Sequence, residues 1–167
     1  MPRKDPAEER RSAAEFIVLL LRERHRRVEE GVYTISNDRH VRKLCSMMLW
    51  QHSAALGKYR GCQYWSEGAI GSFERNDGVV TSKLLYGDDA LIHEHLFPRS
   101  QLIDKLFKMT EPKVQTVAAL LNELNIGVVI TAGEDRRLSK RGVENDPWER
   151  YRIAGIRYKM MCPVAEL

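Results

Sequence analysis

The sequence predicts an α+β fold that is mostly helical and carries a small sheet late in the chain. Apolar residues recur at spacings of three and four over residues 7–30, which is typical of a long amphipathic helix. The same spacing returns between Val41 and Leu56. Near the end of the chain, the segment IGVVIT at 126–131 is dominated by β-branched residues and predicts a buried strand.

The first half of the chain contains two long helices. The apolar positions of the first are Ala13, Phe16, Ile17, Leu20 and Val28, and Gly31 ends it. Ser36 or Asn37 is expected to cap the second helix, which continues to Gly57. Residues 57–78 are expected to form loops and a short helix around SEGAI.

The middle of the chain is expected to hold a short strand that ends in polar residues. GVVTSKLL at 78–85 is compatible with a strand or a helical turn. ALI at 90–92 predicts a strand that delivers His93, Glu94 and His95 to its end.

Pro98 then breaks the chain, and two helices are predicted at 99–109 and 110–124. Thr110 is the expected N-cap of the second of these, with Pro112 in its first turn. A further helix is expected to open at 132–140, directly after the strand at 126–131. DPWERYRIAGI at 146–156 predicts a loop or short helix anchored by Trp148, Tyr151 and Ile153.

Length and composition favour one domain in a cytoplasmic protein. The 167 residues are divided into a helical part (1–87), a strand–helix unit (88–141) and a C-terminal clamp (142–167). No apolar run is long enough to span a bilayer, and the charged N-terminus lacks a signal-peptide core. Cys45, Cys62 and Cys162 are odd in number and widely spaced, which argues against a disulfide framework and a thiolate zinc site. The net charge of +4 permits a polyanionic partner without requiring one.

Two segments carry the chemistry. HEHLFPRS at 93–100 places Glu94 between two histidines, and Leu96 and Phe97 separate His95 from Pro98. VITAGEDRRLSK at 129–140 runs from a strand into an acidic helix start. This order of strand, strand and helix resembles the ββα-metal fold of the HNH nucleases. The resemblance covers roughly residues 88–141 and implies an HNH-like unit that carries a helical insertion between its strands. The last histidine of the family pattern is replaced here by Asp135.

The resemblance implies a metal-dependent DNA endonuclease. Glu94 and Asp135 are the expected ligands of one divalent cation, and their oxygen atoms favour Mg²⁺ or Mn²⁺. His95 is the expected general base, because a neutral imidazole can take a proton from the attacking water. Asn125, with Asn122 as a fallback, and His93 are expected to support His95. Arg99, Arg136 and Arg137 are candidate phosphate contacts.

Three other interpretations remain open at this point. The chain could be an inactive relative that binds nucleic acid or protein, or a metal-independent RNA-cleaving toxin that uses His93 and His95 as an acid–base pair. Alternatively, Glu94 forms an ion pair with an arginine, and the only role of Asp135 is to stabilise the N-terminal turn of its helix. A homodimer is expected if both DNA strands are cut, and stand-alone HNH proteins commonly serve restriction or defence. Tyr64, Trp65 and Phe73 are expected to form a hydrophobic mini-core rather than a base-stacking surface.

Overall fold

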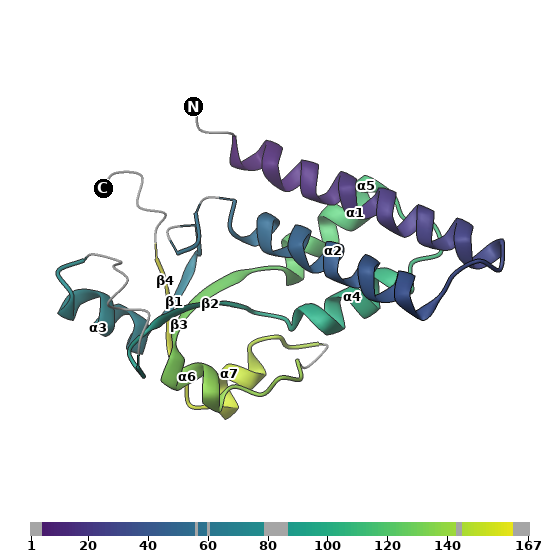
Figure 1. Cartoon of the computed structure of the whole chain (residues 1–167). Helices are drawn as coiled ribbons and strands as arrows, with labels where there is room; N and C mark the ends of the chain where they lie inside the picture. Colours follow the sequence, from purple (N-terminus) through teal and green to yellow (C-terminus); the bar gives the residue numbers. More distant parts are fainter. Residues whose placement is uncertain (1–4, 56, 60, 79–86, 143–144, 162–167) are drawn as a thin grey trace. The chain divides into compact units, whose positions relative to one another are not determined.

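The computed structural model describes residues 5–55, 57–59, 61–78, 87–142 and 145–161 (Figure 1). The chain forms two compact units, each with segments from two parts of the sequence. The helical unit comprises residues 1–55 and 99–125, and the sheet unit comprises residues 56–98 and 126–167. The segment predicted as a strand or helical turn at 78–85 lies, apart from Gly78, outside the described residues.

The helical unit consists of α1 (Pro6–Glu29), α2 (Ile35–Ser53), α4 (Arg99–Phe107) and α5 (Val114–Leu124). All four helices were predicted from the sequence and are confirmed. α1 packs against α2 and α5, and α2 packs against α4. The buried side chains that hold this unit together include Ile17, Leu21, Cys45, Leu49, Leu102, Leu106, Val117 and Leu121.

Two of the predicted helix starts are wrong. Thr34, not Ser36 or Asn37, is the N-cap of α2, and Asn37 completes a capping box by accepting a hydrogen bond from the Thr34 backbone N–H. α5 begins at Val114 with Lys113 as its N-cap, so Thr110 precedes the helix altogether.

The sheet unit contains a four-stranded mixed sheet in the order β2-β3-β1-β4. Its elements along the chain are β1 (Tyr64–Ser66), α3 (Glu67–Arg75), β2 (Leu91–His95), β3 (Gly127–Thr131), α6 (Ala132–Arg137), α7 (Glu149–Ile153) and β4 (Tyr158–Met160). β2 and β3 are antiparallel, β1 and β3 are parallel, and β1 and β4 are antiparallel. The fold is therefore α+β with a small sheet, as predicted; β1 and β4 were not predicted.

The chain between the edge strand β2 and its neighbour β3 leaves the sheet unit. α4 and α5 occupy this stretch and belong to the helical unit, so the two helices predicted between these strands are present. Thr131 then caps α6 directly after β3: its hydroxyl accepts from Glu134 N at 3.2 Å, while Glu134 Oε2 accepts from Thr131 N at 2.9 Å. The strand thus turns into the helix without a loop.

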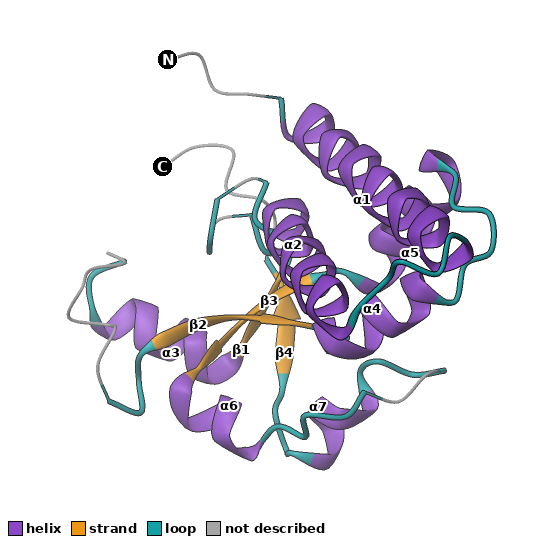
Figure 2. Ribbon diagram, turned by 45° about the vertical axis from the view of Figure 1, so that its right-hand side comes forward, coloured by secondary structure: helices purple, strands orange, loops and turns teal. Residues whose placement is uncertain are grey.

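The two faces of the sheet bury separate hydrophobic clusters. One face carries Tyr59, Cys62, Trp65, Leu91 and Val129, and Trp65 meets Phe73 edge-on at 5.4 Å. The mini-core predicted from the aromatic residues is confirmed for Trp65 and Phe73, whereas Tyr64 packs on the other face of the sheet, against Trp148. α6 and α7 lie next to one another over the other face (Figures 1 and 2). There the cluster comprises Leu96, Val128, Ile130, Leu138, Tyr151 and Ile156.

The C-terminal segment holds to the sheet through its aromatic residues. Trp148 stacks on Tyr158 at 3.9 Å, and Tyr151 is fully buried. Ile153, predicted as a third anchor, is 76% exposed, so that prediction is wrong. Among the residues that the structure describes, no helix is both long and apolar enough to cross a membrane.

Candidate functional site

Strand β2 carries the residues expected to form the centre. His93, Glu94 and His95 lie within the strand rather than beyond its end, paired with Val129, Val128 and Gly127 of β3. Because successive side chains in a strand point to opposite faces, His93 and His95 share one face and Glu94 lies on the other. Their neighbours on the sheet confirm this alternation.

The two histidines stack on the face that holds Cys62. Their ring centroids are 5.2 Å apart and their planes differ by 24°. His93 covers Gly127 so closely that a Cβ built there would lie 2.5 Å from His93 Nε2 and 2.8 Å from Cys62 Sγ. His95 is 3% exposed. Both imidazoles are therefore packed elements of this face, and the His95 ring is not open to a substrate.

Glu94, on the opposite face, is held by a buried arginine that was not predicted as part of the site. Arg150 Nη2 lies 2.5 Å from Glu94 Oε1 and 2.6 Å from the carbonyl oxygen of His95. Its Nη1 donates to the carbonyl of Ser139 at 2.8 Å, and its Nε donates to that of Leu96 at 3.2 Å. The Arg150 side chain is 1% exposed. The guanidinium is thus fixed by three backbone carbonyls and one carboxylate.

Asp135 lies on α6, which covers the same face as Glu94. Its Oδ1 accepts from Lys140 Nζ at 3.1 Å. Burial raises the pKa of the Tyr151 phenol, and the charges of Glu94 and Asp135 raise it further. The charge of Arg150 opposes this increase. Glu94 on β2 and Asp135 on α6 thus lie on the same face of the sheet unit.

The side chains of this neighbourhood do not fit a divalent metal ion. Two carboxylates on one face would be suitable oxygen ligands, but a dication bound to Glu94 would lie beside a guanidinium that cannot move away. At about 5 Å, with an effective dielectric constant of about 20, that repulsion amounts to roughly 6 kcal/mol. The histidine face lies across the sheet. In the described part of the chain, no group of three or more His, Cys, Asp or Glu side chains is placed to hold a metal.

Asn125 has a structural role in the helical unit. It is the C-cap of α5, and its Nδ2 donates to the carbonyl of Leu49 at 2.7 Å and lies 3.2 Å from Nδ1 of His52. Burial, with a smaller contribution from the charge of Arg10, lowers the pKa of His52 from 6.5 to about 4, and a hydrogen bond with Asn122 opposes the shift. Both asparagines that the sequence suggested thus serve His52. Because Asn125 and His95 belong to different units, a contact between them stays a prediction.

The predicted phosphate contacts belong to both units. Arg99 begins α4 in the helical unit and is exposed. Arg136 forms an ion pair with Asp88, and Arg137 donates to the carbonyl of Ala154 at 3.4 Å. These two arginines line a groove of about 480 Å³ in the sheet unit, together with Glu67, Gly68, Gly71, Arg75, Asp88, Asp89, Thr131, Gly133 and Glu134. The groove mixes both signs of charge, so it is not a dedicated anion site.

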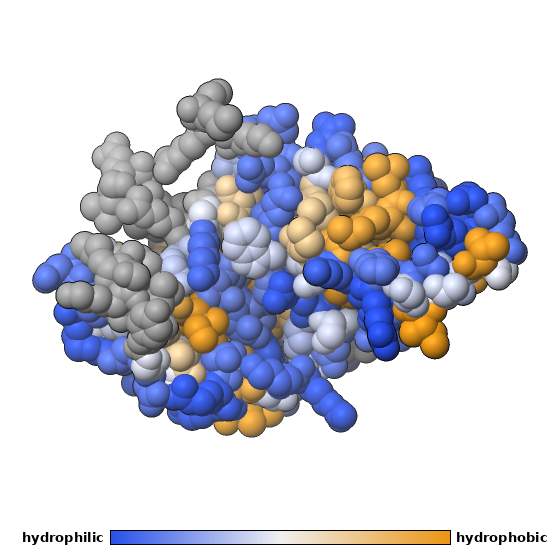
Figure 3. All heavy atoms as spheres, in the orientation of Figure 1, coloured by the Kyte–Doolittle hydropathy of each residue, from blue (hydrophilic) through white to orange (hydrophobic). Residues whose placement is uncertain are grey.

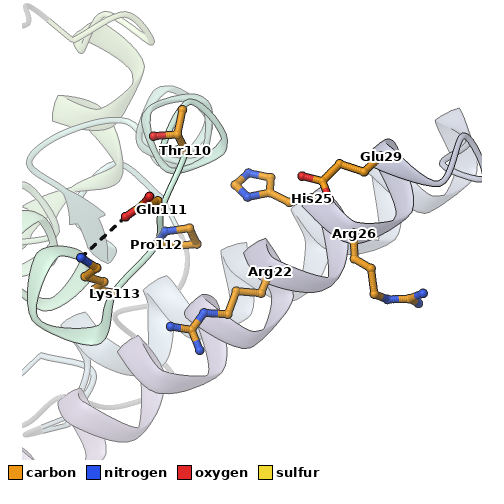
Figure 4. A pocket seen from close by; sticks show the side chains of 8 residues that line it. All are labelled: Arg22, His25, Arg26, Glu29, Thr110, Glu111, Pro112 and Lys113. Carbon is orange, nitrogen blue, oxygen red and sulfur yellow. Dashed lines mark ion pairs between the residues drawn. The ribbon is translucent and has the colours of Figure 1, made fainter.

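A second groove, of about 390 Å³, lies within the helical unit (Figure 4). Arg22, His25, Arg26 and Glu29 contribute from α1, and Thr110, Glu111, Pro112 and Lys113 line the other side. Lys113 pairs with Glu111 at 3.7 Å, and Arg26 points away from the opposite wall. This groove also presents both signs of charge.

The excess positive charge of the chain belongs to one unit. The sheet unit has twelve arginines and lysines and twelve aspartates and glutamates, whereas the helical unit has fifteen and eleven. Any non-specific attraction to a polyanion is therefore expected from the helical unit rather than from the sheet unit.

Sequence reasoning missed Arg150 because it lies in DPWERYRIAGI, which was assigned to packing alone. The available signal was an arginine between two aromatic anchors, Trp148 and Tyr151, since a charge in such a segment is buried only when it is paired. Comparison of the chain with protein-family models, with curated proteins and with solved structures found no match.

Proposed function

We propose that this chain is an HNH-like nucleic-acid-binding protein whose centre is closed by the guanidinium of Arg150, so that it binds nucleic acid without cutting it. The observation that carries the proposal is the set of four hydrogen bonds that fix Arg150 beside Glu94. The strand–strand–helix order of β2, β3 and α6, together with HEHLFPRS, supports the HNH-like assignment.

The guanidinium supplies the positive charge that a bound cation would supply in a nuclease centre. It neutralises Glu94 and joins that strand end to Ser139, which follows α6. A permanently charged group held by backbone carbonyls supplies no open coordination position and no activated water. The centre therefore stabilises the unit rather than a transition state.

Binding is assigned to the helical unit, because that unit holds the whole excess of positive charge. Contacts of arginine and lysine with phosphates make affinity fall steeply as the salt concentration rises, largely independent of base sequence. Arg99 is exposed at the start of α4 and is the predicted contact that belongs to this unit.

A second candidate is a Mg²⁺- or Mn²⁺-dependent DNA endonuclease. The observation that favours it is that Glu94 on β2 and Asp135 on α6 lie on the same face of the sheet. Such an enzyme would require Arg150 to release Glu94, and it would require His95 to become accessible.

The deciding experiment measures binding and cleavage on the same samples. Supercoiled plasmid and single-stranded RNA are incubated with the protein and Mg²⁺, Mn²⁺ or EDTA, and binding is followed by gel shift. The proposal expects binding without cleavage in every buffer. Cleavage that requires a divalent ion and is lost in His95→Ala and Asp135→Ala, but not in the exposed control Glu123→Gln, would establish the endonuclease instead.

The remaining outcomes are equally informative. RNA cleavage in EDTA that depends on His93 and His95 would establish the metal-independent toxin. Failure to bind either nucleic acid at low salt would overturn the proposal. A loss of affinity in Arg99→Gln places the binding surface on the helical unit, and Arg136→Gln/Arg137→Gln is the comparison for the sheet unit. Each lost phosphate contact is expected to lower the slope of log affinity against log salt concentration by about 1.

A further inference from the structure

Helix α2 presents a stripe of four exposed side chains on one side. Arg39, Lys43, Met47 and Trp50 follow one another at spacings of four, four and three residues, which place them on the same face of a helix. All four are exposed, whereas Cys45 and the other buried residues of α2 lie on the opposite side. The stripe spans about 16 Å along the helix axis. We call these four residues the α2 stripe.

The two cations of the α2 stripe are not neutralised by neighbouring acids. Helix α2 carries Arg39, Arg42 and Lys43 but a single acid, Asp38. That carboxylate accepts a hydrogen bond from Arg42 at 2.7 Å and lies 3.8 Å from Arg24 of α1. Neither Arg39 nor Lys43 forms an ion pair with any residue that the structure describes. Their charges, about 6 Å apart along the helix axis, are therefore available to an anion outside the chain.

Trp50 gives the α2 stripe an aromatic end. Its side chain is 45% exposed, whereas Trp65 is 6% exposed and Trp148 stacks on another ring of the sheet unit. Met47 lies between Trp50 and Lys43 along the stripe and is 53% exposed. Figure 3 shows hydrophilic and apolar side chains next to one another over α1 and α2. Cations beside an exposed aromatic ring are the combination that binds single-stranded nucleic acid, because the cations contact phosphates and the ring stacks on a base.

We propose that the α2 stripe binds single-stranded nucleic acid, with Arg39 and Lys43 on phosphates and the indole of Trp50 stacked on a base. An unpaired base is required, because the bases of a duplex are stacked on one another and their faces are closed to a side chain. This inference rests on the proposed function and deepens it, since it names the helix that makes the contact and the form of nucleic acid that is bound.

Fluorescence anisotropy of a labelled oligothymidylate and of a duplex of the same length, titrated with the full chain at several salt concentrations, tests the proposal. Wild type is expected to bind the single strand more tightly than the duplex, with quenching of its tryptophan fluorescence. Arg39→Gln/Lys43→Gln is expected to lower the slope of log affinity against log salt concentration by about 1.4, since each phosphate contact on a single strand contributes about 0.7. Trp50→Ala is expected to weaken binding at least about fivefold, and Trp50→Phe to retain most of the affinity without the quenching.

The matched control is Arg11→Gln/Arg27→Gln, which removes the same charge from α1. Both arginines are held in ion pairs there, with Glu15 at 2.9 Å and Glu23 at 2.7 Å, so the wild-type salt slope is expected. All substituted positions are exposed or half-buried, and circular dichroism checks that each variant is folded. A wild type that binds neither probe would overturn the proposed function as well. If wild type binds, then a wild-type slope in Arg39→Gln/Lys43→Gln, an unchanged affinity in Trp50→Ala, or a duplex bound as tightly as the single strand would overturn this inference alone.

Discussion

Arg150 Nη2 lies 2.5 Å from Glu94 Oε1 and 2.6 Å from the carbonyl oxygen of His95, so one guanidinium binds a side chain and the backbone of its neighbour together. The same group also reaches the carbonyls of Leu96 and Ser139. Because Arg150 is buried, its charge is compensated entirely by these four acceptors. The end of β2, the segment after α6 and helix α7 are thereby fixed at one point.

Replacing Arg150 with methionine is expected to destabilise the chain strongly. The substitution keeps the apolar stem but leaves Glu94 and three carbonyl oxygens without their donor. Breaking a partly buried ion pair by removing one partner costs about 3 to 5 kcal/mol of unfolding free energy. Urea denaturation followed by circular dichroism measures the change.

Two comparisons separate the role of Arg150 from that of an ordinary surface arginine. Arg152→Met removes an exposed ion pair with Asp146 and is expected to lower the free energy of unfolding far less than Arg150→Met does. Arg150→Met/Glu94→Gln is expected to cost less than the sum of its single substitutions, because the orphaned carboxylate is gone. Equal costs for Arg150→Met and Arg152→Met would show that the four hydrogen bonds contribute little.

The helices and the central strand could be predicted from the sequence because local patterns determine them. Apolar spacing defined α1, α2, α4 and α5, and β-branched composition defined β3. β1 and β4 are three residues each, too short for a periodic pattern, and they exist because β3 and β1 offer them hydrogen-bonding partners. Helix caps were misplaced where two or three neighbouring polar residues could serve, as at Thr34 and Ser36.

The candidate site was only partly predictable. The sequence predicted that Glu94 and Asp135 hold one divalent cation; both lie on the face covered by α6, and their binding of a cation stays a prediction. It did not indicate that Glu94 and His95 would point to opposite faces, because this follows only if β2 continues through His95 rather than ending before His93. Arg150 lies 55 positions from His95, and no local pattern links them.

Gly127→Ala is expected to destabilise the sheet unit by about 1 to 3 kcal/mol. The added methyl group would meet His93 Nε2 at 2.5 Å and Cys62 Sγ at 2.8 Å, and both side chains are packed on a buried face. Gly133→Ala is the matched control. Its nearest neighbour would be the carbonyl oxygen of Asp88 at 3.4 Å, and alanine is favoured over glycine in a helix. In thermal denaturation, the midpoint of Gly127→Ala is therefore expected to be lower than that of wild type, and the midpoint of Gly133→Ala is not. A similar decrease in both variants would contradict the packing of His93 against Gly127.

The thiols of Cys45 and Cys62 are expected to be unreactive in the folded chain. Burial raises the pKa of each to about 12, so the thiolate that attacks a disulfide reagent is scarce at neutral pH. In a Cys162→Ser background, a chromogenic disulfide reagent is expected to label no thiol in native buffer and two in denaturant. Rapid labelling of the native protein would show that the two core positions are accessible.

The stability of the chain is expected to fall as the pH drops below about 6.5. Burial lowers the pKa of His52 from 6.5 to about 4, with a further contribution from the charge of Arg10. Between these two values the unfolded state binds a proton that the folded state excludes, so acidification favours unfolding. The shift corresponds to at most about 3 kcal/mol, fully present above pH 6.5 and lost as the pH falls toward 4. The geometry agrees, because Asn125 Nδ2 is a donor and His52 Nδ1 can accept from it only while unprotonated.

Urea denaturation between pH 4 and pH 7 isolates this contribution when wild type is compared with two variants. His52→Gln retains a group that can accept from Asn125 but does not titrate, so its stability is expected to vary less with pH than that of wild type. His40→Gln changes an exposed histidine of the same helix and is expected to keep the wild-type pH dependence. If the free energy of unfolding changes with pH equally in wild type and His52→Gln, the acid sensitivity originates at other groups. In that case burial on α2 does not hold His52 neutral.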